Sequence, residues 1–124
     1  MSQNGSIIDA LAAGTTDRAG RLIHNQDYRG GHFLIKTSTT AGATVTSVVT
    51  IEGLVPGTTG TFYTVLASSA LNPADSSVTR MTVYPGISTG ALRSLDVLPE
   101  YFRVRTTQAT TGVRTLSVQA NLIV

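Results

Sequence analysis

The sequence is poor in the residues that carry most protein chemistry. It contains no cysteine, no tryptophan and only two histidines, and charged residues make up 13% of the chain, where about 25% is typical. The absence of cysteine excludes a disulfide framework and a thiolate metal site. A single lysine, Lys36, stands beside eight arginines, without the basic runs and interleaved aromatics of nucleic-acid-binding modules. We therefore expect no direct nucleic-acid partner.

The hydrophobic residues do not form long uninterrupted runs. No apolar stretch approaches the roughly 18 residues that a membrane-spanning helix needs. Residues 1–14 lack the basic segment that precedes the apolar core of a secretory signal. We expect a protein that is made in the cytoplasm and has no membrane partner.

Catalytic and metal-binding patterns are equally scarce. A serine hydrolase needs a histidine base oriented by a carboxylate, and the sequence offers only His24 and His32 for that role. His24, Asp27 and His32 are candidates for a metal site, but two histidines eight residues apart across a Gly-Gly turn form a weak pattern. The acidic residues are scattered singly, and no calcium loop or glycine-rich phosphate loop is present. We expect a non-enzymatic protein with no cofactor, no metal and no small-molecule substrate.

Residues that favour β-structure are abundant. Twenty threonines and twelve valines make up about a quarter of the 124 residues, and their branched side chains suit a pleated strand better than a helix. Seven segments fit strands separated by Gly- and Pro-rich turns. They are residues 18–25, 31–39, 45–53, 61–68, 77–84, 101–107 and 113–124. Short strands at this spacing predict an antiparallel β-sandwich or flattened barrel of about seven or eight strands.

The last strand has the clearest alternation. Leu116, Val118, Ala120 and Leu122 share one face, and polar residues occupy the other, which is the period of a half-buried strand. A strand this apolar, running unguarded to Val124, must be central, closed into a barrel or paired in an assembly. The predicted core follows from the same alternation in each segment. It consists of Phe33, Ile35, Val49, Ile51, Leu66, Val83, Phe102, Val104, Leu116, Val118 and Leu122.

The N-terminal segment differs from the rest of the chain. Residues 7–13 have the only helix-like spacing, and they predict either one or two helical turns or an arm that packs on a neighbour. We divide the chain into an N-terminal arm, residues 1–14, and a β-sandwich domain, residues 15–124. The apolar side chains of Ile7, Ile8 and Leu11 need cover, and an arm of this length cannot supply it alone. They are therefore candidate interface residues.

The arginines supply the other interface candidates. Arg103 and Arg105 lie two positions apart, on one face of one expected strand, together with Tyr101. Guanidinium groups bind carboxylates in a bidentate fashion, and arginine and tyrosine are enriched in interfaces where lysine is depleted. One interpretation is docking onto an acidic patch of another subunit, with Arg80 and Arg114 as lesser candidates. The other is a solvated face with intramolecular partners such as Glu100 or Asp96.

Three stretches resemble motifs of a known family. They are VTIEGLVPGTTGTFYTVLAS, MTVYPGI, and LPEYFRVRTTQATTGVRTLSVQANLIV, and the Gly30-Gly31-x-Phe33-x-Ile35 entry fits the same series. Together, over residues 28–124, they resemble a widespread family of small virion proteins of tailed bacteriophages. Met81 stands where the family pattern has leucine. The resemblance implies a β-sandwich with a role in the virion, as a capsid decoration (cement) protein or a part of the tail region, and it implies no catalytic residues.

Three functions follow as hypotheses. The first is a capsid decoration protein on the virion surface that binds and stabilises the shell of major capsid protein. The second is another virion part, such as a tail, head-tail connector or head-fibre subunit. The third is a glycan- or protein-binding β-sandwich module, which the lack of tryptophan disfavours. For the first, the expected partners are the major capsid protein and further copies of the chain, as a trimer in preference to a dimer.

Overall fold

The computed structural model describes residues 6–14, 18–25, 28–39, 46–68, 77–90, 92–95, 97–109 and 114–123. These residues form strands, turns and loops, with no helix among them. The strands are β1 (Ser6–Gly14), β2 (Arg18–Ala19), β3 (Ile23–His24), β4 (Gly30–Thr39), β5 (Thr46–Leu54), β6 (Phe62–Ala67), β7 (Ser77–Val83), β8 (Arg93–Ser94), β9 (Tyr101–Ala109) and β10 (Arg114–Ile123). Within this part of the chain, no helix is long and apolar enough to cross a membrane.

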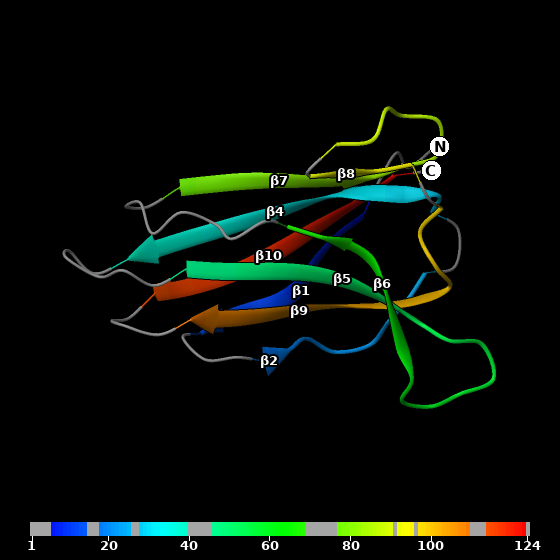
Figure 1. Cartoon of the computed structure of the whole chain (residues 1–124), viewed down its shortest axis with the longest axis horizontal. Coiled ribbons are helices and arrows are strands. Elements are labelled where there is room, and N and C mark those ends of the chain that lie inside the picture. The colour runs from blue at the N-terminus through cyan, green and yellow to red at the C-terminus, as the bar shows by residue number, and fades with distance from the viewer. Residues whose placement is uncertain are drawn as a thin grey trace.

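Two sheets pack face to face, as the sequence predicted. The first sheet has the order β1-β10-β4-β7-β8, and the second has the order β2-β9-β5-β6, with β3 also paired to β9. Every pair is antiparallel except β7 with β8. Figure 1 shows the second sheet overlying the first. The chain is therefore a β-sandwich, and the flattened-barrel alternative is wrong because the sheets do not close on each other.

The core lies between the two sheets and is built from the alternating apolar residues of the longer strands. All eleven predicted core residues are buried. Phe33 of β4 and Phe102 of β9 meet edge to face across it, with ring centroids 5.9 Å apart. The prediction did not include six further members of the core, Ala10, Leu11, Ile23, Met81, Leu98 and Ala120.

The last strand is central, which was one of the three arrangements expected for it. β10 lies between β1 and β4 in the first sheet, so both of its edges are paired. β9 and β10 are neighbours in sequence but belong to different sheets. The chain therefore crosses from one layer to the other between them.

The helical interpretation of residues 7–13 is wrong, because these residues lie in strand β1. β1 pairs with β10, and its register shifts between Asp9 and Leu11 and again between Leu11 and Gly14. Such bulges interrupt the period of two, so that Ala10 and Leu11 are both buried although they are adjacent. This interruption gives the sequence its helix-like spacing. Leu11 packs into the core of its own chain and needs no cover from a neighbour.

The expected strand over residues 18–25 is divided into β2 and β3. Between them, the backbone of Gly20 donates a hydrogen bond to the carbonyl of Val104, 2.7 Å away. A Cβ at position 20 would lie 1.9 Å from the carbonyl oxygen of Ala10. The close approach of β1 to this segment therefore requires glycine, and it brings the edges of the two sheets together there.

The β5–β6 hairpin is the long turn that the Pro-Gly sequence predicted. Gly57 has a positive φ of 81°, and the amide of Val55 donates to the carbonyl of Thr61 at 2.8 Å. Near the start of the loop, the ring of Tyr63 lies where a side chain at Gly53 would be. A Cβ there would be 2.5 Å from the Cζ atom of Tyr63 and 2.8 Å from Pro99. The glycine thus lets Tyr63 cover this end of the sandwich.

Candidate interaction surface

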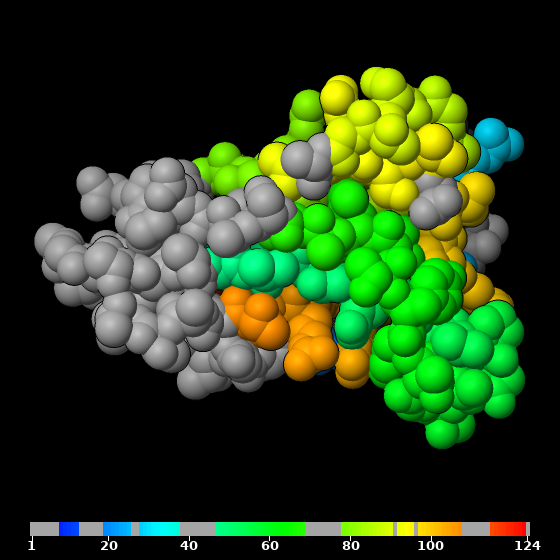
Figure 2. All heavy atoms as spheres, in the orientation of Figure 1, coloured from blue at the N-terminus to red at the C-terminus, as the bar shows by residue number. Residues whose placement is uncertain are grey.

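The three residues that the sequence singled out on one strand lie together on the outer face of the second sheet. Phe102, Val104 and Thr106 of β9 are buried. Because side chains alternate along a strand, Tyr101, Arg103 and Arg105 therefore point outward. Figure 2 shows this side of the molecule, with β5, β6 and β9 at the surface. We call this surface, consisting of Tyr101, Arg103 and Arg105 with Glu52 and Phe62, the Arg103 face.

Arg103 is held by Glu52 on the adjacent strand β5 and by Phe62 on the next strand, β6. Its Nε donates to a carboxylate oxygen of Glu52 at 2.8 Å, and these residues are directly opposite in the β5–β9 register. Its guanidinium carbon lies 3.6 Å from the centre of the Phe62 ring, a cation–π contact. The side chains of Arg103 and Glu52 are 26% and 13% exposed. The guanidinium is therefore fixed in one orientation while one side stays open to solvent.

The intramolecular partner of Arg103 differs from the two that were expected. Glu100 pairs with His24 instead, and Asp96 lies outside the described residues. Glu52 is 51 residues away in sequence, and only the strand register brings it opposite Arg103. The alternation of β9 could predict that Arg103 faces outward, but it could not predict what lies beside it.

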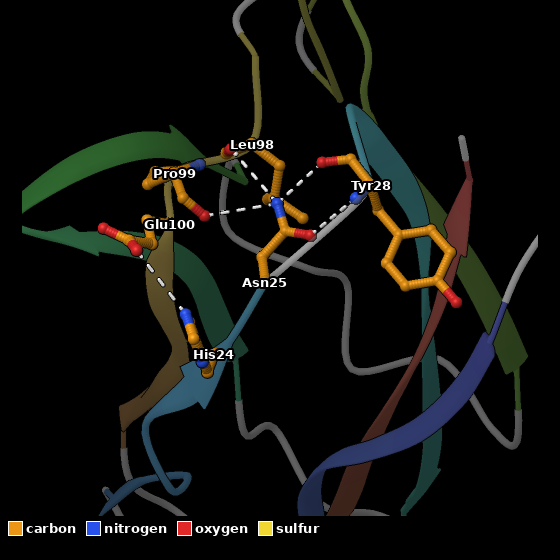
Figure 3. Close-up of polar contacts among 6 residues, drawn as sticks. All are labelled: His24, Asn25, Tyr28, Leu98, Pro99 and Glu100. Carbon is orange, nitrogen blue, oxygen red and sulfur yellow. Dashed lines mark hydrogen bonds and ion pairs between the residues drawn. The ribbon is translucent and has the colours of Figure 1, made fainter.

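Tyr101 is held by a histidine. Its ring stacks on that of His24, with centroids 4.5 Å apart and an angle of 10° between the planes. These residues are opposite each other in the β3–β9 register. The Nε2 of His24 is 3.5 Å from the carboxylate of Glu100, as Figure 3 shows. The tyrosine is thus presented on the face in a fixed orientation.

Arg105 is the exposed cation of the group. It lies opposite Ala19 on β2 and Thr50 on β5, and neither residue can neutralise its charge. Among the described residues, no carboxylate lies within ion-pair distance of it. Arg105 is therefore available for a carboxylate from another molecule, whereas Arg103 already shares its charge with Glu52.

A hollow adjoins the Arg103 face at the end of the sheet. It has a volume of about 300 Å³ and is lined by Leu54, Pro56, Gly57, Thr58, Tyr63, Pro99, Glu100 and Tyr101. Tyrosine, proline and leucine side chains form part of its walls, together with Thr58 and Glu100. Tyr63 is 45% exposed, and Leu22 near the opposite edge is also exposed. Aromatic and apolar groups beside an arginine are the residue types that dominate binding energy in protein interfaces.

A buried asparagine positions the start of β9, and sequence reasoning missed it. The amide nitrogen of Asn25 donates to the carbonyls of Tyr28, Leu98 and Pro99, at 2.7, 3.3 and 3.3 Å. Its amide oxygen accepts from the backbone N–H of Tyr28 at 3.0 Å, and its own N–H donates to the carbonyl of Glu100 at 2.6 Å. Figure 3 shows the Asn25 side chain between the backbone at Tyr28 and the backbone of residues 98–100. Asparagine's tendency to bond to backbone a few residues on was the available signal.

The remaining interface candidates lie elsewhere. Arg80 is on the first sheet, in β7. Ile8 is partly buried against the core, and Leu11 is a core residue. The side chains of Ile7 and Arg114 lie outside what the structure describes, although the backbone of each belongs to a strand. Of the eight candidates, the structure brings together Tyr101, Arg103 and Arg105.

The two histidines are on different sheets. His24 belongs to β3 and stacks on Tyr101, whereas His32 belongs to β4 and its Nδ1 is 3.0 Å from the hydroxyl of Thr82. Asp27 lies outside the described residues. In the described ranges, no group of three or more His, Cys, Asp or Glu residues could hold a metal ion.

Comparison of the chain with protein-family models, with curated proteins and with solved structures gives no match. The sequence resemblance and the geometry of the surface are therefore what supports a function.

Proposed function

We propose that this chain is a non-enzymatic structural protein of a tailed-bacteriophage virion, and that it decorates the capsid by binding and stabilising the shell of major capsid protein. The observation that carries the proposal is the Arg103 face. An arginine and a tyrosine are held there by Glu52, Phe62 and His24 on the outer face of the second sheet. Side chains ordered before binding lose little entropy on association.

The sandwich suits a part that resists mechanical load. Its strands are joined by continuous ladders, such as the ten register pairs between β10 and β4, and its core is one apolar cluster. A shell under internal pressure is stabilised when a stiff part buries surface across the joints between subunits. The resemblance of residues 28–124 to small virion proteins of tailed bacteriophages supports the same role.

The proposed partners are the major capsid protein and further copies of the chain. A trimer at three-fold or quasi-three-fold joints is favoured over a dimer, because shell subunits most need clamping there. The support for self-association is the Arg103 face alone, since Leu11 of the expected arm is already buried in its own chain. The proposed location is the outer surface of the capsid.

Electron cryomicroscopy of the virion that contains this protein tests the location. We expect density of the size of one sandwich, repeated over the outer shell. Density confined to the tail, the connector or a head fibre would contradict decoration and assign the chain to another virion part. Absence from purified virions, checked by mass spectrometry, would contradict both.

A further inference from the structure

The outer face of the first sheet, on the side opposite the Arg103 face, carries an alternating set of cations and aliphatic residues. In the β4–β7 register Leu34 is opposite Arg80, and Lys36 is opposite Val78. Phe33, Ile35 and Met81, which alternate with these residues along the two strands, are buried, so the four side chains point outward. We call the surface formed by Leu34, Lys36, Val78 and Arg80 the Lys36 face.

The two cations of this face are diagonal neighbours. Diagonal positions on adjacent strands are about 7–8 Å apart, so Lys36 and Arg80 repel each other. In the part of the chain that the structure describes, neither has a carboxylate within ion-pair distance. An anionic partner would remove this repulsion.

The nearest described acid on the same side of the sheet does not neutralise them. Asp9 lies on β1, opposite Gln119 of β10, whose amide donates to its carboxylate at 3.3 Å. β10 and β4 separate β1 from β7. At about 4.8 Å per strand, the backbone of Asp9 is roughly 10 Å from the β4 strand of Lys36 and roughly 14 Å from the β7 strand of Arg80, and both distances exceed the screening length of about 8 Å at physiological salt.

Apolar surface lies between the cations. Val78 is 66% exposed, and Leu34 beside it is half-buried. A groove of about 490 Å³ crosses the sheet and is lined by Leu34, Lys36, Val78 and Ser117, and by Asp9 and Gln119 at its β1 end. An apolar centre bordered by charged groups is the usual anatomy of a protein–protein interface.

Nucleic acid fits this face less well. Binding to single strands relies on aromatic rings that stack on bases, and the only Phe, Tyr or Trp of β4 and β7 is Phe33, which is in the core. Binding to duplexes relies on many phosphate contacts, whereas this face has two closely spaced cations with an apolar side chain beside each.

We infer that the Lys36 face binds an acidic segment of a partner protein, whose carboxylates pair with Lys36 and Arg80 while an aliphatic side chain enters the groove against Leu34 and Val78. The identity of the partner protein rests on the proposed function. The segment then belongs to the major capsid protein, which the chain contacts through the Lys36 face in addition to the Arg103 face.

The test uses the full chain labelled with ¹⁵N and three probes. These are a synthetic peptide rich in Asp and Glu with a central leucine, the same peptide with serine in place of leucine, and a short DNA duplex. We expect the leucine peptide to shift the amide signals of β4 and β7. We expect the serine peptide to bind about tenfold more weakly, because the buried leucine side chain is lost.

Two matched variants locate the binding. Lys36→Gln/Arg80→Gln should weaken the leucine peptide about tenfold. Arg21→Gln/Arg29→Gln, which removes the same charge from exposed loop positions, should leave its affinity unchanged. Equal loss in both variants, or binding of the DNA duplex as tight as that of the leucine peptide, would show general attraction to polyanions and overturn the inference. Peptide-induced signals that map to the Arg103 face, or no signal shift at all, would also overturn it.

The outcome is separable from that of the proposed function. If the chain loads onto capsids and the Lys36→Gln/Arg80→Gln variant loads equally well, the assignment of the Lys36 face to the shell fails and decoration stands. If the peptide binds as expected and capsids are not decorated, the binding chemistry of the face stands and the proposed partner fails.

Discussion

Asn25 and Leu98, 73 residues apart in sequence, are joined by a hydrogen bond from the side-chain amide of one to the backbone carbonyl of the other. The same amide also bonds the carbonyls of Tyr28 and Pro99. One buried side chain thus connects the segment between β3 and β4 with the segment that enters β9. The Arg103 face depends on this connection, because Tyr101 follows directly after the bonded segment.

Replacing this asparagine should destabilise the fold. Asn25→Ala leaves buried carbonyl groups without a donor and should cost about 1–3 kcal/mol. Asn25→Asp should cost more at neutral pH, because a carboxylate oxygen would then face the carbonyl oxygens that now accept from an amide. Urea unfolding measures both changes. An Asn25→Asp protein with the midpoint of the original would show that the side chain is not held as described.

The aromatic contact between the sheets should also be costly to remove. Phe102→Ala deletes a fully buried ring that meets Phe33 across the core, and it should lower the free energy of unfolding by about 3–5 kcal/mol. Val97 is exposed, so Val97→Ala serves as the control and should change it by less than about 0.5 kcal/mol. Equal effects of the two substitutions would contradict the assigned core.

Much of the fold could be predicted from the sequence because most strands alternate regularly. Leu116 to Leu122 in β10, and Phe102 and Val104 in β9, show the period of two directly, and their burial followed. β1 was missed because its bulges place Ala10 and Leu11 on the same side. The partner of Arg103 could not be predicted, since Glu52 meets it only through the β5–β9 register.

The Arg103–Glu52 pair should show measurable coupling. A double-mutant cycle with Arg103→Ala, Glu52→Ala and the double variant should give a coupling of about 1 kcal/mol in unfolding free energy, because the pair is partly shielded from solvent. The coupling should fall modestly as salt is added. Additive effects of the two substitutions would mean that Arg103 is not fixed by Glu52 in solution.

Stability should decline in mild acid because of His32. Burial, and secondly the nearby charge of Arg80, lower the pKa of His32 below its usual 6.5. The unfolded chain therefore binds a proton more readily than the native protein, so stability is fully present above pH 6.5 and is lost as the pH falls through the native pKa. Thermal unfolding at a series of pH values should show a smaller decline in His32→Gln. An identical profile for the two proteins would contradict the burial of this imidazole.

Loading of the purified chain onto empty capsids, assembled from the major capsid protein of the same virus, tests the proposed function most directly. Particle mass should rise to a plateau as the chain is added, and the temperature at which the particles break should rise with it. Arg103→Ala/Arg105→Ala should lower the apparent affinity and its dependence on salt, because it removes the two arginines of the Arg103 face. Particles that gain no mass at saturating concentrations of the original chain would contradict the account.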